Sequence, residues 1–223
     1  MVQPIRLALF DCDGTLVDSQ ANICLAIERA FEEYGLAQPG NHAARRVVGL
    51  SLVEAMRRLH PEGEEALLTD LAQCYRDHYI AMRNAGVLEE PLYPGIADLV
   101  RDLHGAGWML GVATGKSQRG LERVLAQHAL TDCFTTLQVA DHHPSKPHPS
   151  MIYQALADTG AEAAYTLMIG DTVFDMEMAV AAGARAIGVD WGYHEPEELI
   201  AAGAEVVVRD AAHLAELLAA VRA

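Results

Sequence analysis

Basic residues are scarce in this sequence. Its 223 residues include 16 Lys and Arg against 31 Asp and Glu, which gives a formal net charge of −15. Proteins that bind nucleic acid rely on Lys and Arg to neutralise backbone phosphates, so we expect no nucleic-acid partner. A small anionic ligand remains compatible with this charge, because a local site that holds a metal ion can be positive within an acidic protein.

Cysteine pairs and long apolar runs are missing as well. The four cysteines lie far apart in sequence and form no CxxC pair, which argues against a structural zinc site and indicates reduced thiols. The apolar stretch before Asp11 is too short for a signal peptide or a membrane span. We therefore expect a cytoplasmic protein without a membrane partner. The sequence gives no indication of the oligomeric state.

Short apolar runs rich in β-forming residues predict six strands, at residues 6–10, 108–113, 135–139, 165–169, 185–189 and 205–208. Apolar residues repeat at helical spacing at residues 96–103 and 214–221, and glycines stand where such helices should end, at Gly105, Gly107, Gly160 and Gly183. Strands that alternate with helices favour a parallel sheet covered on both faces. The expected fold is α/β, with a Rossmann-like parallel sheet as its core.

The gap between the first two predicted strands, residues 11–107, is far longer than the roughly one dozen residues that a crossover helix needs. Three stretches of this gap, 23–34, 52–59 and 67–82, carry apolar residues at helical spacing. We expect an inserted all-helical cap domain at residues 18–87 and a Rossmann-like core made of residues 1–17 and 88–223. Pro91 and Pro94 interrupt helix in the returning segment, which makes it a candidate hinge.

The segment FDCDGTLVDS places Asp11 and Asp13 directly after the first strand. Ligands of open parallel sheets bind at the carboxyl ends of the strands, and two carboxylates there need a cation or a shared proton to offset their repulsion. The fourth strand ends in MIGDTVFD, so Asp171 lies at its exit and Asp175 one helical turn later. Oxygen ligands of this kind suit Mg²⁺. Turn formation and helix capping are the ordinary structural alternatives for these acids.

Two further segments favour a phosphate site. The second strand ends in VATGK, where Thr114 and Gly115 precede a predicted helix whose free N–H groups favour an anion. The segment PSKPHP holds Lys146 between prolines, which should keep its ammonium group in a fixed place. Taken alone, the first segment could simply cap a helix. The second could simply carry a solvated loop lysine.

The four segments FDCDGTLVDS, VATGK, SKPHP and GDTVFD resemble, in this order, the motifs of the haloacid dehalogenase superfamily. The helical insert after the first motif resembles the cap of the subgroup that includes phosphoglycolate phosphatases and β-phosphoglucomutases. This resemblance implies a phosphatase that acts on a small phosphorylated metabolite, with phosphoglycolate as the first candidate.

By the same resemblance, Asp11 attacks phosphorus to form an aspartyl phosphate, and Asp13 protonates the leaving oxygen and then activates water. Mg²⁺ would be held by the Asp11 carboxylate, the Asp13 backbone carbonyl and Asp171, with Asp175 in support. The phosphoryl oxygens would be bound by Thr114, the Gly115 amide and Lys146.

Asp13 argues against a dehalogenase, since the members that cleave carbon–halogen bonds lack the second acid of the first motif. A β-phosphoglucomutase-like phosphotransferase remains an alternative, although Leu52 stands where the mutase pattern carries Arg. A third possibility is a binding module that keeps the fold and has lost the chemistry. In the cap segment, Arg45, Arg46 and Ser51 are candidate substrate contacts, with a solvated helix end as the alternative.

Overall fold

The structure, a computed structural model, describes residues 4–221. The predicted core ranges also include residues 1–3 and 222–223, which lie outside the described residues. Six parallel strands form one sheet in the order β3-β2-β1-β4-β5-β6. Their bounds are β1 Leu7–Phe10, β2 Met109–Thr114, β3 Thr136–Val139, β4 Thr166–Gly170, β5 Arg185–Val189 and β6 Val206–Val208. The strand prediction is therefore confirmed, with ends that differ by a residue or so.

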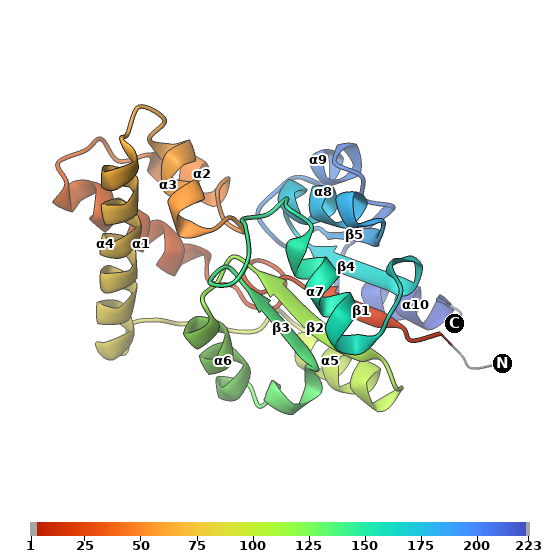
Figure 1. The fold of residues 1–223 in the computed structure, drawn as a ribbon. Helices are drawn as coiled ribbons and strands as arrows, with labels where there is room; N and C mark the ends of the chain where they lie inside the picture. The colour runs from red at the N-terminus through yellow and green to blue at the C-terminus, as the bar shows by residue number, and fades with distance from the viewer. Residues whose placement is uncertain (1–3, 222–223) are drawn as a thin grey trace.

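Helices cover both faces of the sheet (Figure 1). One face packs against α5 (Ile96–Gly105), α6 (Gln118–Gln127) and α10 (Ala211–Ala220), and the other against α7 (Ser150–Thr159), α8 (Val173–Ala182) and α9 (Pro196–Ala201). Strand side chains alternate between the two layers, so that Phe10 faces the first and Leu9 the second. Two short 3-10 helices, Thr131–Cys133 and Ala163–Tyr165, precede β3 and β4.

The chain between β1 and β2 folds into a helical cap that projects from one end of the sheet (Figure 1). It contains α1 (Gln20–Glu33), α2 (Gly40–Arg45), α3 (Leu52–Leu59) and α4 (Glu65–Asn84). The sequence predicts α1, α3 and α4 but not α2, because a helix this short shows no repeated apolar face. The cap has its own apolar core, in which Ile27, Phe31, Met56 and Leu71 are buried, and Phe174 of the sheet domain packs against it.

The two segments that join the cap to the core lie side by side. The Asp18 amide donates to the Pro91 carbonyl at 2.9 Å, and the Tyr93 amide donates to the Leu16 carbonyl at 3.0 Å. These backbone hydrogen bonds pair the outgoing and returning segments with each other. Where the cap begins and ends, at residues 18 and 87, stays a prediction. None of the helices in residues 4–221 combines the length and the apolar character that crossing a membrane requires.

Candidate active site

Asp11 and Asp171 meet at the carboxyl edge of the sheet, at the point where the strand order reverses. Asp11 follows β1 and Asp171 follows β4, and these two strands are neighbours. Such a reversal leaves a crevice between the helices of the two faces, which is where open α/β sheets bind ligands. Both carboxyl groups are fully buried. The fold therefore brings together two acids that are 160 positions apart in sequence.

Lys146 is the cation of this crevice. Its ammonium group lies 3.0 Å from Oδ1 of Asp11 and 2.6 Å from Oδ1 of Asp175. Burial acts to lower the pKa of Lys146, but these two carboxylates outweigh it and raise the pKa above its ordinary value. The lysine therefore stays charged at physiological pH, which suits the binding of an anion.

Asp175 contacts two residues that explain its position. Its Oδ1 accepts from Lys146, while Oδ2 accepts from the hydroxyl of Thr172 at 2.6 Å and from the Thr172 amide at 3.1 Å. Thr172 and Asp175 together cap the first turn of α8. The sequence also allowed Asp171 as the cap of this helix, and that alternative is wrong, because Thr172 holds the cap position and Asp175 completes the capping box. Asp175 therefore both helps to cap α8 and orients Lys146.

The carboxylates fit a divalent cation. Oxygen atoms of Asp11, Asp171 and Asp175 lie within 4.8 Å of one another. When ionised, these three groups and Lys146 carry two net negative charges, and Oδ2 of Asp11 is buried without a hydrogen-bond partner. Burial raises the pKa of Asp11 to about 7 and that of Asp171 well above its ordinary value. An oxygen-seeking ion such as Mg²⁺ would relieve both the repulsion and the missing contact.

Asp171 is fixed by two neighbours besides the acids. The Thr15 hydroxyl donates to its Oδ1 at 2.8 Å, and the Tyr193 amide donates to its Oδ2 at 3.0 Å. These donors hold the carboxylate toward Asp11 and leave lone pairs free for an ion. Sequence reasoning did not find Thr15, although it belongs to the first motif, or Tyr193, which lies far from every motif.

Asp13 faces a different set of groups. Its Oδ1 accepts from the Ser19 hydroxyl at 2.5 Å and from the Lys116 ammonium at 2.7 Å. Lys116 also lies 3.0 Å from Oε1 of Glu90, which accepts from the Tyr79 hydroxyl at 2.9 Å. Burial acts to lower the pKa of Lys116, but Asp13 and further ionisable neighbours raise it well above its ordinary value. The chain has only two lysines, and each is ion-paired with one acid of the first motif.

The two remaining phosphate candidates stand at the end of β2. Because Phe10 pairs with Val112, the residues after β1 lie beside Thr114, which is buried. The cap loop at Gly49 and Leu50 covers this edge: a Cβ atom added to Gly115 would lie 2.5 Å from the Leu50 carbonyl oxygen. Ser51 of the same loop donates its amide to the Ser145 hydroxyl at 2.9 Å. The structure is therefore closed, with the cap seated on the phosphate candidates.

The cap residues singled out from the sequence contact the core. Arg46 forms a two-pronged ion pair with Glu198 at the start of α9, with distances of 2.5 and 2.8 Å. Arg45 donates to the Gly192 carbonyl at 3.5 Å. These contacts, with that of Ser51, dock the cap on the sheet domain. Their expected contact with a substrate stays a prediction.

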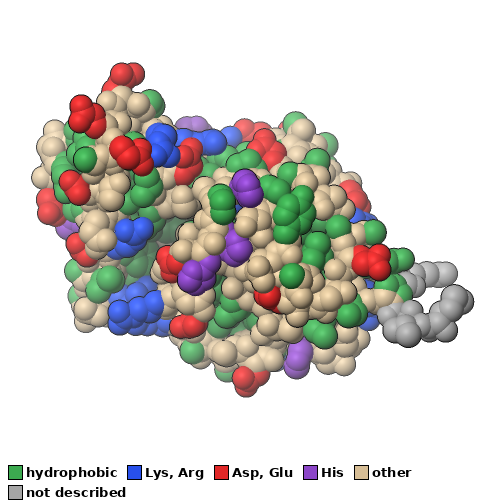
Figure 2. Space-filling model, in the orientation of Figure 1, with side chains coloured by type: hydrophobic (Ala, Val, Ile, Leu, Met, Phe, Trp, Pro, Cys, Tyr) green, Lys and Arg blue, Asp and Glu red, His purple; other side chains and the backbone are tan. Residues whose placement is uncertain are grey.

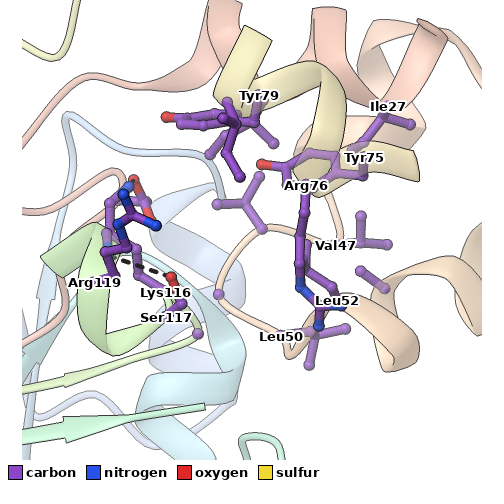
Figure 3. A pocket seen from close by; sticks show the side chains of 18 of the residues that line it. Ile27, Val47, Leu50, Leu52, Tyr75, Arg76, Tyr79, Lys116, Ser117 and Arg119 are labelled. Carbon is purple, nitrogen blue, oxygen red and sulfur yellow. Dashed lines mark hydrogen bonds and ion pairs between the residues drawn. The ribbon is translucent and has the colours of Figure 1, made fainter. Parts of the chain in front are cut away.

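A cavity of about 240 Å³ lies between cap and core next to Asp13 (Figure 3). Gly115 and Lys116 line it from the core, while Tyr75 and Tyr79 line it from α4. Arginines of α4 and α6 also line it. Sequence reasoning missed this feature, because arginines on two separate helices show no common motif.

Comparison with known proteins places the chain in a family. Residues 8–189 match the family model of haloacid dehalogenase-like hydrolases, a range that contains all seven motif residues described above. The chain therefore belongs to the haloacid dehalogenase-like hydrolases, and it is an enzyme of the phosphatase type.

Individual relatives agree with this assignment. The chain is 35% identical over 209 residues to the "Probable phosphatase IndB" of Dickeya dadantii, covering 91% of this chain and 88% of the relative. It is 32% identical over 225 residues to a phosphoglycolate phosphatase of Yersinia pestis, covering 97% and 93% of the two chains. A crystal structure described as a predicted phosphatase from Clostridium acetobutylicum superposes with a TM-score of 0.87 at 25% identity, covering 98% of this chain and all of the other.

Proposed function

We propose that this protein is a Mg²⁺-dependent phosphatase that hydrolyses a small phosphomonoester through an aspartyl phosphate on Asp11. The observation that carries the proposal is the state of the Asp11 carboxylate. One oxygen is engaged by Lys146 and by the Cys12 amide, at 3.0 and 2.6 Å, and the other is buried without a partner. An unpartnered buried carboxylate oxygen is costly, and a metal-bound nucleophile in contact with a phosphoryl group accounts for it.

Each catalytic step has its group in this chain. Asp11 attacks phosphorus, while Thr114, the Gly115 amide and Lys146 bind the phosphoryl oxygens. Asp13 gives its proton to the leaving oxygen and then takes one from the water that attacks the aspartyl phosphate, which releases inorganic phosphate and restores Asp11. Seating of the cap loop on Gly115 keeps bulk water away during the first step.

The expected metal ligands are the Asp11 carboxylate, the Asp13 backbone carbonyl and Asp171, with Asp175 holding Lys146 in place. Bound there, Mg²⁺ would neutralise charge on the nucleophile and the phosphoryl oxygens. The substrate would be a small phosphomonoester, and phosphoglycolate is the first ester to assay, because several relatives carry the name phosphoglycolate phosphatase. A cytoplasmic location also stays a prediction.

The test is hydrolysis of an aryl phosphate by purified protein. Activity should require Mg²⁺, disappear with EDTA, and be abolished by Asp11→Asn. Asp13→Asn should lower the rate by about 10²–10⁴-fold, as expected for loss of a general acid and base. Asp18→Asn is the matched control, because Asp18 belongs to the same segment but is exposed. A broad panel of phosphate esters left intact by the wild-type protein would refute the proposal and favour the binding module.

A phosphotransferase remains the second candidate. Leu52 lines the cavity where the mutase pattern carries Arg, so the cap offers no charged group at this position to hold a phosphorylated intermediate. Phosphorus NMR of a reaction with β-glucose 1-phosphate separates the two. Inorganic phosphate as the product supports hydrolysis, and glucose 6-phosphate would support the mutase.

A further inference from the structure

The cavity next to Asp13 is the space into which a leaving group must extend. Asp13, Gly115 and Lys116 form its end at the catalytic edge, whereas Asp11 and Lys146 are not among its lining residues. The phosphoryl group would therefore be held outside this cavity, and the group that takes the proton from Asp13 would occupy it. Its shape and lining carry information on the substrate. What this lining implies about the leaving group rests on the phosphatase chemistry proposed above.

Four arginines line the cavity, and Figure 3 labels one from each of the two helices that carry them, Arg76 and Arg119. Arg76 and Arg83 are two turns apart on α4 of the cap, and Arg119 and Arg123 are one turn apart on α6 of the core. Within residues 4–221, none of the four forms an ion pair with a carboxylate. Figure 2 shows Lys and Arg side chains at the junction of cap and core on the face in view.

The absence of acidic partners in the cavity is notable in so acidic a chain. Acidic residues outnumber basic ones 31 to 16, yet the contacts of these arginines within residues 4–221 are uncharged: Arg76 donates to the Gln73 side chain at 3.3 Å, and Arg83 lies over the Tyr79 ring, 5.3 Å from its centroid. When the cap closes, two walls that carry like charges approach each other. An anion between them would remove that repulsion and accept charge-assisted hydrogen bonds from both sides.

The rest of the lining is mostly apolar. Its apolar and aromatic members come from α1, the loop before α3, α3 and α4, and they are Ile23, Ile27, Val47, Val48, Leu50, Leu52, Ala55, Met56, Tyr75, Tyr79 and Ile80. A polyhydroxylated sugar would find few hydrogen-bond partners on such a surface. A flat apolar body would find the stacked rings of Tyr75 and Tyr79, whose centroids are 5.7 Å apart.

Size argues against the smallest substrates. A cavity admits one water molecule at about 10–15 Å³ in the same measure, so 240 Å³ accommodates many more atoms than a two-carbon acid has. Glycolate would leave most of the apolar lining without contact. A filled cavity needs a body of ring size, and such a body would meet arginines of both walls.

From these observations we infer that the substrate is a phosphomonoester whose leaving group has an apolar, ring-sized body and a second anionic group, such as a carboxylate. The anion is bound between α4 and α6 by the four arginines, with Arg76 and Arg119 contributing one contact from each wall. Specificity is thus set by residues of the cap helix and of the core helix together, and it is expressed only when the cap is closed.

Matched aryl phosphates test this inference directly. The 3- and 4-carboxyphenyl phosphates are compared with their methyl esters, which keep the ring and lose the charge, and with phosphoglycolate. The esters have the better leaving groups, so intrinsic reactivity works against the expected result. The wild-type protein should hydrolyse at least one carboxylate with a kcat/KM about ten-fold or more above that of its ester, and the ratio should shrink as salt screens the charges.

The variant Arg76→Gln/Arg119→Gln should bring that ratio close to one. The control Arg29→Gln/Arg101→Gln removes the same charge from one exposed cap residue and one exposed core residue away from the cavity, and it should keep the ratio. Circular dichroism verifies that both variants fold. A variant that does not fold is replaced by Arg83→Gln/Arg123→Gln, for which the same loss is expected.

The outcomes separate the two proposals. Equal hydrolysis of acid and ester by the wild-type protein, or a preference that survives in both arginine variants, would overturn the inference while the phosphatase function stands. Phosphoglycolate as the best substrate by a wide margin would also overturn it. If no ester is hydrolysed at all, the proposed function itself fails, and the inference fails with it.

Discussion

Gly115→Ala tests whether the seated cap loop is needed for catalysis. The backbone of Gly115 is not in the left-handed region, so its conformation allows alanine. The added Cβ atom would lie 2.5 Å from the Leu50 carbonyl oxygen and 2.7 Å from that of Gly49. Ordinary contact begins near 3.4 Å, so the cap loop must withdraw by roughly 1 Å.

A displacement of this size at a reacting centre can cost about 10²-fold in rate. We therefore expect kcat/KM for an aryl phosphate to fall by about 10²-fold, or about 2.7 kcal/mol. The free energy of unfolding should change little, because the clash involves only the contact between cap and core. Steady-state kinetics and urea denaturation measure the two quantities.

Hydrogen exchange supplies an independent readout of the same event. The Ser51 amide, which donates to Ser145 at 2.9 Å, should lose protection in Gly115→Ala when the loop withdraws. Gly105→Ala is the control, since a Cβ atom there meets nothing within 4 Å. Wild-type kcat/KM together with wild-type protection of Ser51 in Gly115→Ala would show that seating of the loop is not required.

Two further predictions concern docking and metal binding. In a double-mutant cycle of Arg46→Gln and Glu198→Gln, the coupling in unfolding free energy should stay below about 1 kcal/mol, because both side chains are over a third exposed; a coupling of several kcal/mol would contradict this. Mg²⁺ at 100 times its Kd should stabilise the protein at pH 8 by about 2.7 kcal/mol, or about 5–11 °C in Tm, as measured by differential scanning calorimetry. Burial raises the pKa of Asp11 from 3.8 to about 7, so the metal-free protein loses stability as pH rises between these values. The Tm shift should therefore be smaller at pH 5, where protonated Asp11 competes with the metal; an equal shift at both pH values would contradict it.

The sheet and its edge could be predicted from the sequence because both follow from local rules. Each strand is a short apolar run, and parallel strands must place their carboxyl ends together. This reasoning brought Asp11, Thr114, Lys146 and Asp171 to one edge, and the structure places them there. Helix ends could be predicted for the same reason. Helices α7 and α8 end at Gly160 and Gly183, and both glycines adopt the left-handed conformation that glycine favours.

The docking of the cap could not be predicted in the same way. The sequence makes Arg46 a candidate substrate contact, whereas in the structure it pairs with Glu198, which lies 152 positions away in a helix with no motif. The contact depends on how two separately packed cores sit against each other, and neither apolar periodicity nor a motif reports that. The arginines of the cavity were missed for the same reason, although four of the few basic residues of the chain fall on just two helices.

The ion pairs of Lys116 connect the cap to the proposed general acid and base. Tyr79 of α4 donates to Glu90 in the returning linker, Glu90 pairs with Lys116 of the core, and Lys116 pairs with Asp13. Each of these groups is largely buried, so water screens their interactions weakly. A movement of α4 that displaces Tyr79 leaves Glu90 to Lys116 alone and changes the electrostatic surroundings of Asp13. In this conformation α4 of the cap is therefore linked to Asp13 through Tyr79, Glu90 and Lys116.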